Sequence, residues 1–423
     1  MKILKAPFFL VLMLIVLTAN CQEPTVIRGR VIDQELKTGL AYVNIGLRHT
    51  NAGTVSSESG AFQLTIPSTA VGDSVQFSYM GYGTERFAIK NLLDGENIVA
   101  LPRKSILLSE AIVNPVSAEE YVRRAIDRVT ANYADKSLLA TGDYYSFTSF
   151  NETQEKSLKE AVVSTYVPGS NDKQELHSSI LHARIINKSV QKETNTGSNR
   201  KQEKWNTIDS ILPTMFEMML GDELSGIDPV HDDDAYFFLQ PSKFKKFKFH
   251  LDEVVSYGDR RMLVISFDQL KRIKRDLTKG KIFIDTESFA IAAIEYEGVF
   301  KVPGILKLML APFGLDWDEV RYTESVQYRE FSDKWFITSK HHTYYFDMER
   351  TKVFQSNEDK ITFIEQSFVV TDLQTNEVQP IEEAKRIKQG VPWDEQALDP
   401  DPSFWDTYNP NRPKKFEAVL EQE

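Results

Sequence analysis

Four consecutive residues, His250-Leu251-Asp252-Glu253, carry a signature of metal chemistry. A histidine and a glutamate three positions apart can supply two Zn²⁺ ligands from a helix or a loop, and His341 or His342 could supply a later one. The context, however, is that of a strand, because Phe247 and Phe249 alternate with polar residues. On a regular strand the histidine and the aspartate share one face, while the glutamate points to the other. The sequence therefore predicts no zinc site here.

A second candidate for a metal site is the acidic run His231-Asp232-Asp233-Asp234. Its oxygen atoms suit Ca²⁺ or Mg²⁺, but it lacks the alternating ligand pattern of a calcium-binding loop. We favour a solvated loop, and we expect the chain to hold neither a metal nor a cofactor.

Basic and aromatic residues are interleaved from Lys243 to Phe249, and a second basic group follows from Lys271 to Arg275. Such a pattern can bind nucleic acid or anionic lipid headgroups. It is also typical of a sheet whose outer face is charged and whose phenylalanines pack inward. We favour the sheet because the chain as a whole is acidic, with lipid headgroups as the next choice.

An apolar stretch from Val302 to Phe313 is bounded by proline and glycine. The pattern favours a buried helix, and the alternative is a mobile flap against a bound apolar ligand. In that alternative the ligand would touch Val302, Ile305, Leu308, Met309 and Phe313. We find no Gly-x-Ser-x-Gly elbow, phosphate loop or dinucleotide fingerprint, so nothing supports nucleophilic or nucleotide chemistry.

The composition is that of an ordinary globular protein, since 41% of the 423 residues are hydrophobic and 26% are charged. Fifty lysines and arginines against 61 aspartates and glutamates give a formal net charge of −11. General nucleic-acid binding needs a surplus of clustered cations. We therefore expect no nucleic-acid partner.

The amino terminus has the layout of an export signal. Two lysines precede the apolar run Pro7–Leu17, which is too short to span a bilayer. Ala19 and Cys21 fit a small-x-small cleavage site, whereas a lipidated cysteine usually follows Gly, Ala or Ser and this one follows asparagine. We expect residues 1–21 to be a signal peptide cleaved after Cys21, with lipid anchoring at that cysteine as the alternative. The mature chain, expected to contain no transmembrane helix, would then be exported and periplasmic or outer-membrane-associated.

Residues 22–103 form short apolar runs broken by Gly, Asp and Asn, a pattern typical of an antiparallel β-sandwich. Gly60 and Gly81 occupy turn positions that need positive φ, while Phe62 and Phe77 suit the core. The strands are expected at 26–32, 41–47, 53–55, 62–66, 74–79 and 86–89.

Several coupled motifs in this segment resemble the carboxypeptidase-regulatory-like domain. They are Gly29-x-Val31-x-Asp33, Leu40-Ala41-x-Val43-Asn44-Ile45, Gly53-Thr54-Val55-Ser56, Glu58-x-Gly60-x-Phe62 and Ser78-x-x-Gly81-Tyr82. That family is a prealbumin-type β-sandwich common in exported envelope proteins of Gram-negative bacteria. The resemblance implies a structural or interaction module without catalytic residues, and a sugar or peptide site on its loops stays open as an alternative.

A linker at residues 104–116 leads into an expected α+β domain at residues 117–380. Ser117 and Glu120 form a capping box, and apolar residues at helical spacing predict a helix that ends near Tyr133. Later strands with short connections predict an antiparallel meander. These strands are expected at 263–267, 282–285, 290–296, 320–328, 335–346 and 361–370.

Two shorter motifs resemble parts of other envelope proteins. The segment Gly280–Asp285 with Ala290-Ile291 is similar to a hairpin of bacterial lipoprotein-carrier proteins, whose half-open barrel holds acyl chains. The segment Phe404–Asn409 resembles a carboxy-terminal signature of exported proteins that begin with the regulatory-like module. Residues 381–423 are expected to form an extended tail.

The sequence thus predicts a mainly β protein with an α+β part: an antiparallel β-sandwich, then a larger domain with a curved antiparallel sheet and covering helices. We expect a non-enzymatic, exported cell-envelope protein with a binding or scaffold role. Its sandwich would be the interaction module, and its partner an envelope protein or a lipid. The alternative is a periplasmic carrier of lipid or another apolar ligand in the sheet domain, and the remote third interpretation is a zinc carboxypeptidase.

Overall fold

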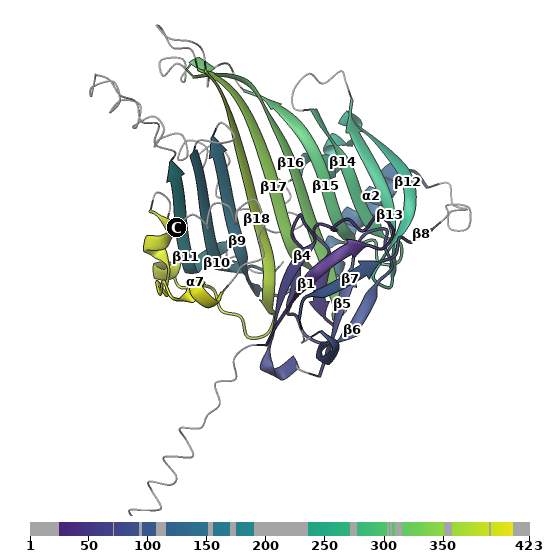
Figure 1. The fold of residues 1–423 in the computed structure, drawn as a ribbon. Helices are drawn as coiled ribbons and strands as arrows, with labels where there is room; N and C mark the ends of the chain where they lie inside the picture. Colours follow the sequence, from purple (N-terminus) through teal and green to yellow (C-terminus); the bar gives the residue numbers. More distant parts are fainter. Residues whose placement is uncertain are drawn as a thin grey trace, which may run out of the picture.

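The protein places a small β-sandwich against one face of a wide, curved sheet, with short helices on the other face (Figure 1). The structure, a computed structural model, describes residues 25–70, 72–92, 95–106, 116–150, 155–169, 175–189, 236–270, 277–302, 304, 307–308, 315–350, 358–388 and 391–408. The expected signal peptide, the acidic run 231–234 and the basic group 271–275 lie outside these residues. In the described part of the chain, no helix combines the length and apolar character needed to cross a membrane.

The sandwich consists of a three-stranded sheet, in the order β4-β1-β7, and a four-stranded sheet, in the order β3-β2-β5-β6. Strand β1 pairs antiparallel with β4 but parallel with β7, so the expectation of a wholly antiparallel sandwich is corrected at that pair. The elements are β1 (Thr25–Asp33), β2 (Asn44–Leu47), β3 (Gly53–Val55), β4 (Ala61–Ile66), η1 (Ser68–Ala70), β5 (Ser74–Ser78), β6 (Glu85–Ala88), η2 (Ile89–Asn91) and β7 (Asn97–Leu101).

The inward faces of the two sheets form a continuous apolar core. Phe62 and Phe77 meet edge to face in it, with ring centroids 5.3 Å apart. Gly60 and Gly81 have φ values of +83° and +79°, as predicted for their turns. Tyr42, by contrast, was expected inside a strand but has φ of +59° and turns the chain just before β2.

The large sheet has eleven strands within the described residues, in the order β11-β10-β9-β18-β17-β16-β15-β14-β13-β12-β8. From β12 to β18 each strand pairs with the next one along the chain, which confirms the predicted meander. Strand β18 then returns to pair with β9. The bounds are β8 (Ser105–Ile106), β9 (Leu138–Phe150), β10 (Glu155–Val167), β11 (His177–Ser189), β12 (Phe247–Tyr257), β13 (Arg260–Gln269), β14 (Leu277–Asp285), β15 (Ile291–Lys301), β16 (Leu315–Phe331), β17 (Lys334–Arg350) and β18 (Glu358–Gln374).

Short helices cover one face of this sheet: α2 (Ala118–Asp127), α3 (Val129–Asn132), η4 (Phe237–Leu239) and η5 (Pro241–Lys246). The Ser117 hydroxyl accepts a hydrogen bond from the Glu120 amide at 3.2 Å, as the capping box predicts. The expected single helix is divided at Arg128 into α2 and α3. Phe244 and Phe247 are buried as expected, although the residues before Phe247 form a 3-10 helix and not a strand.

The last described residues wrap around the edge strand β11. They include η7 (Glu383–Lys385), α6 (Trp393–Gln396) and α7 (Phe404–Thr407). The amide of Leu398 donates to the carbonyl of Ile180 at 2.9 Å. The ring of Phe404 stacks on His182 with centroids 3.6 Å apart. Because an uncovered edge strand offers unpaired backbone groups to other chains, this segment protects the sheet from edge-to-edge association.

Candidate binding site

A cavity of about 990 Å³ lies between the sandwich and the large sheet. We call the side of the sheet that borders it the sandwich face, and the opposite side the helix face. The floor of the cavity consists of two cross-strand rows, in which directly paired residues of β12 to β17 share the sandwich face. The rows are Lys248-Asp268-Lys279-Glu297-Thr323-Thr343 and His250-Ser266-Lys281-Glu295-Ser325-His341.

Positive and negative groups alternate across the floor. Lys279 and Glu297, which are directly opposed on β14 and β15, form an ion pair of 2.7 Å between Nζ and Oε1. Lys281 and Glu295 are opposed in the neighbouring row. No side chain in either row is apolar, so the floor offers hydrogen-bond donors, hydrogen-bond acceptors and charges of both signs.

The sandwich supplies the opposite wall through Tyr42 and Glu58. Tyr42 has a left-handed backbone conformation, which is energetically costly for a non-glycine residue. Its side chain extends from the sandwich to the sheet. Its hydroxyl lies 3.0 Å from Nε2 of His341, and the two rings are 4.8 Å apart. Behind His341, the Tyr145 hydroxyl donates to the fully buried carboxylate of Glu365 at 2.8 Å.

These tyrosine hydroxyls stay protonated because their surroundings disfavour the phenolate. Burial is the main cause that raises the pKa of Tyr42, and the nearby charge of Glu365 raises it further. The same two causes raise the pKa of Tyr145 well above its ordinary value. Both side chains therefore act as neutral hydrogen-bond donors and not as general bases.

A second hollow of about 430 Å³ continues the cavity beneath Tyr79 and Tyr82 of the sandwich, and both hollows are lined by Lys281 and Glu295. Glu295 reaches solvent inside the cavity but is otherwise surrounded by protein. This desolvation raises its pKa, and Lys281 offsets part of the effect. Burial also raises the pKa of Tyr79 to about 12, with a smaller contribution from Glu295. The two hollows form one trough along the seam between the sandwich and the sheet. It is polar along the two floor rows and partly apolar in the second hollow, where Met80, Val255, Val264 and Phe283 line it.

Hydrogen bonds fix the sandwich as a wall of this trough. The Gly81 amide donates to the carbonyl of Ser256 at 2.9 Å, and the Ser256 hydroxyl donates to the carbonyl of Tyr82 at 3.1 Å. Farther along the seam, Asn51 Nδ2 donates to the carbonyl of Leu373 at 2.8 Å. Both contacts join turns of the sandwich to the sheet and hold the two walls of the trough together.

The His-x-x-Glu motif lies at this trough, but not as expected from regular alternation. A β-bulge between Leu251 and Glu253 breaks the alternation, and Glu253 then pairs opposite Val264 while His250 pairs opposite Ser266. His250 and Glu253 therefore share the sandwich face, which corrects our expectation of opposite faces. Asp252 accepts a hydrogen bond from Ser266 at 2.9 Å. Among the described residues, no group of three or more metal-ligating side chains converges.

The expected apolar-ligand segment is described only in part. Val302 is buried, whereas Leu308 is 70% exposed. Ile305, Met309 and Phe313 lie outside the described residues. The role of these five side chains therefore stays a prediction.

The two floor rows were missed in the sequence, although a signal for them exists. On β13 and β14, for example, the polar residues Ser266, Asp268, Lys279 and Lys281 recur at every second position. That alternation indicates one polar face on each strand. The alternation does not give the register between neighbouring strands. That register decides whether their polar positions lie opposite one another and form rows.

Comparison with solved structures finds several weakly similar proteins, and no curated protein matches. A domain described as that of an outer membrane lipoprotein-sorting protein from Vibrio parahaemolyticus is 9% identical, with a TM-score of 0.23 over 62% of this chain and 95% of that chain. A DUF1329 family protein from Desulfovibrio piger is 9% identical, with a TM-score of 0.22 over 62% and 93%. A protein of unknown function from Bacteroides fragilis, described as membrane-associated, is 9% identical, with a TM-score of 0.15 over 82% and 98%. TM-scores this low do not establish a common fold.

The amino-terminal segment gives a more definite result. Residues 27–113 match the family described as the CarboxypepD_reg-like domain. The match contains every strand of the sandwich except the first two residues of β1. The resemblance predicted from the glycine, asparagine and phenylalanine motifs is thereby confirmed for residues 27–113.

Proposed function

We propose that this protein is a non-enzymatic, exported cell-envelope protein that binds a polar ligand of mixed charge in the trough between its sandwich and its sheet. A short peptide has the required chemistry, because it offers backbone donors and acceptors together with charges of both signs. The CarboxypepD_reg-like domain acts as the interaction module by forming one wall of the site. The amino-terminal layout of residues 1–21 supports export.

The observation that carries this proposal is the uninterrupted polarity of the two floor rows beneath a cavity of about 990 Å³. Sites for small ligands have volumes of about 300–1,000 Å³. The charged groups of the floor are already balanced by partners of opposite sign, as in the pair Lys279–Glu297. A ligand of a single sign would be repelled by the floor groups of the same sign, whereas a ligand of mixed charge can match groups of both signs.

The alternative of an apolar-ligand carrier has less support at this site. An acyl chain in the trough would strip water from Lys279, Lys281 and Glu297 without replacing their hydrogen bonds, which is costly. Such a ligand would need a different site, and the expected one around Val302 and Leu308 is described only in part.

Calorimetric titration of residues 22–423 with defined ligands tests the proposal. The probes are a hexapeptide that alternates lysine and glutamate, an uncharged Ser/Gly hexapeptide, and micelles of a short-chain phosphatidylcholine. We expect binding of the mixed-charge peptide, at least tenfold weaker binding of the uncharged peptide, and no saturable binding of the phospholipid. Preferential binding of the phospholipid would contradict the proposal.

A pair of matched variants locates the binding in the trough. Thr323→Trp places an indole on the cavity floor, whereas Thr65→Trp makes the same change at an exposed position of β4, in the sandwich sheet that does not line the trough. We expect Thr323→Trp to weaken peptide binding at least tenfold and Thr65→Trp to leave it unchanged. Equal effects of the two substitutions would place the peptide elsewhere.

A further inference from the structure

A partly buried arginine sits at the seam between the sandwich and the sheet, outside the trough. Arg329 of β16 extends from the sandwich face toward Gly46 of β2 and Gly53 of β3, which are paired with each other. A Cβ atom at Gly46 would lie 1.3 Å from Nη1 of Arg329, and one at Gly53 would lie 3.0 Å from it. The paired glycines therefore leave the space that the guanidinium group fills.

Within the described residues, no acidic partner lies close to the positive charge of Arg329. Its Nη2 donates to the carbonyl oxygen of Asn51 at 3.1 Å. No carboxylate of a described residue lies within 4.0 Å of the guanidinium, and burial lowers the pKa of Arg329. A partly buried cation without a counterion is unfavourable, because it has lost part of its hydration without gaining an opposite charge.

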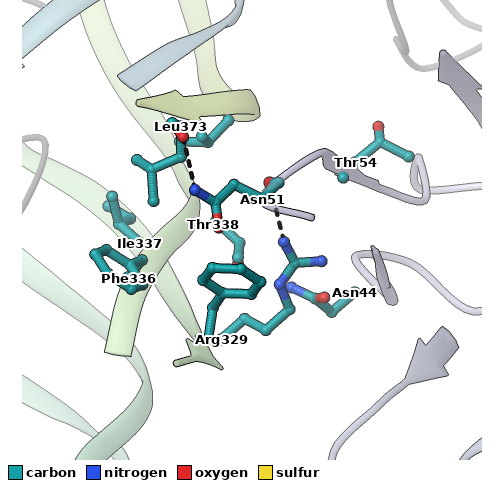
Figure 2. A pocket seen from close by; sticks show the side chains of 11 residues that line it. Asn44, Asn51, Thr54, Arg329, Phe336, Ile337, Thr338 and Leu373 are labelled. Carbon is teal, nitrogen blue, oxygen red and sulfur yellow. Dashed lines mark hydrogen bonds between the residues drawn. The ribbon is translucent and has the colours of Figure 1, made fainter. Parts of the chain in front are cut away.

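A small cavity of about 20 Å³ lies beside this guanidinium (Figure 2). We call it the Arg329 cavity; Asn44, Asn51, Gly53 and Thr54 line it from the sandwich, and Thr338 and Leu373 line it from the sheet. The side chain of Asn44 is only 3% exposed, and its Nδ2 has no hydrogen-bond acceptor. The cavity thus brings together a partly buried cation and a buried amide donor that lacks a partner.

We propose that the Arg329 cavity binds one monatomic anion of the size of chloride. Arg329 supplies the charge and Asn44 Nδ2 supplies a hydrogen bond. A volume of this order holds about one sphere of the size of a water molecule, so phosphate, sulfate and carboxylate groups are excluded by size. The anion neutralises the guanidinium and strengthens the attachment of the sandwich to the sheet.

A single water molecule is the alternative occupant, and one feature favours it. Asn51 Oδ1 also lines the cavity without a hydrogen-bond donor, and a water can donate to it while an anion cannot. A flip of the Asn51 side-chain amide would not solve this, because Nδ2 in its present position donates a hydrogen bond to the carbonyl of Leu373. The experiment must therefore distinguish a halide from water.

Bromide provides the direct test, because it replaces chloride and scatters anomalously while water does not. Crystals of residues 22–423 grown with sodium bromide should show an anomalous peak between the Arg329 guanidinium and Asn44 Nδ2. An ordinary density peak without anomalous signal would identify a water and overturn the proposal. Absence of any peak at this position would overturn it as well.

Thermal unfolding in solution gives a second readout. In sodium chloride we expect a Tm at least about 2 °C higher than in sodium gluconate of the same ionic strength. Arg329→Met should abolish this difference, and Asn44→Asp should abolish it by supplying a carboxylate in place of the anion. Arg321→Met, at an exposed arginine of the same strand, should retain it. Equal Tm values of the unsubstituted protein in the two salts would contradict the proposal, whether or not peptides bind in the trough.

Discussion

The two faces of the large sheet are built from the same strands but differ in chemistry where the cavity of about 990 Å³ lies. On the sandwich face, the floor rows contain no apolar side chain. On the helix face, the row Leu251-Ile265-Ile282-Ile294-Val326 runs directly behind them and belongs to the main core. Phe238 of η4 stacks on Phe267 of this face, with ring centroids 4.2 Å apart. The helices therefore cover an apolar surface that must be buried, whereas the two floor rows beneath the sandwich leave space for water or a polar ligand.

One charged cluster interrupts the helix face and shows what burial of charge requires. The carboxylate of Glu324 is 9% exposed and lies 2.9 Å from Nδ1 of His342 and 3.9 Å from Nζ of Lys340. The Tyr236 hydroxyl donates to it as well. Burial opposes the charge of Glu324, but these neighbours outweigh burial and lower its pKa to about 2. The ion pair Lys279–Glu297 on the cavity floor needs no such enclosure, because both side chains are more than half exposed to water.

The largest expected difference between the faces is in stability. Phe267→Ala on the helix face should lower the free energy of unfolding by about 3–5 kcal/mol, because it opens a cavity in the core. Ser266→Ala, one residue earlier on the sandwich face, removes only the hydrogen bond to Asp252 and should cost about 1 kcal/mol or less. Urea denaturation of both variants measures the contrast. Similar losses would show that the sandwich face is as tightly packed as the helix face.

Acid should weaken the helix face through Glu324. Because its folded-state pKa is lowered from 4.5 to about 2, its contribution is fully present above about pH 4.5 and is lost as the pH falls toward 2. The full contribution is about 3 kcal/mol. Glu324→Gln should therefore destabilise the protein at pH 7. It should also make the free energy of unfolding depend less on pH between about 2 and 4.5. Glu297→Gln on the sandwich face is the control, and a loss as large as that of Glu324→Gln would refute the distinction between the faces.

A substitution at the seam between the sandwich and the sheet should have a smaller effect on the free energy of unfolding. Gly46→Ala pushes a methyl group into the space of the Arg329 guanidinium, so we expect a loss of about 1–2 kcal/mol. Gly72→Ala is the matched control, since a Cβ at that position meets nothing within 4 Å. Thermal unfolding compares the two variants. A Gly46→Ala protein as stable as the control would mean that Arg329 moves away without cost.

The smallest effect on stability is expected for the floor itself. Exchanging the charges of Lys279 and Glu297 should leave the urea midpoint unchanged, because both side chains are more than half exposed and the pair is screened by water and salt. The same exchange should alter the affinity for the mixed-charge peptide, which calorimetry measures. A lowered urea midpoint with an unchanged affinity would assign the pair a structural role and not a binding role.

Much of the fold could be predicted from local patterns. The turn glycines Gly60 and Gly81, the Ser117 cap and the order of the late strands are all encoded within a few neighbouring residues. What could not be predicted depends on distant pairing. Whether β1 meets β7 parallel, and where β18 returns to β9, is decided by contacts between segments far apart in the sequence.

The candidate site was harder to predict than the fold because it depends on register and on backbone irregularities. His250 and Glu253 share a face only because a bulge follows Leu251. Tyr42 reaches His341 from a turn in which its φ is positive. Positive φ is unusual for tyrosine, so the sequence did not predict this turn. Polarity of single strand faces was visible in the sequence, but the rows that they form across the sheet were not.

A native mass spectrum of residues 22–423 from an exported preparation, recorded before and after extraction with organic solvent, tests the central claim most directly. A trough that binds polar ligands predicts either the bare polypeptide mass or an adduct that survives extraction and is displaced by the mixed-charge hexapeptide. The same hexapeptide should form a one-to-one complex with the unsubstituted chain and not with Thr323→Trp. An extractable adduct of lipid mass, with no peptide complex, would contradict the proposed function and favour the apolar-ligand carrier.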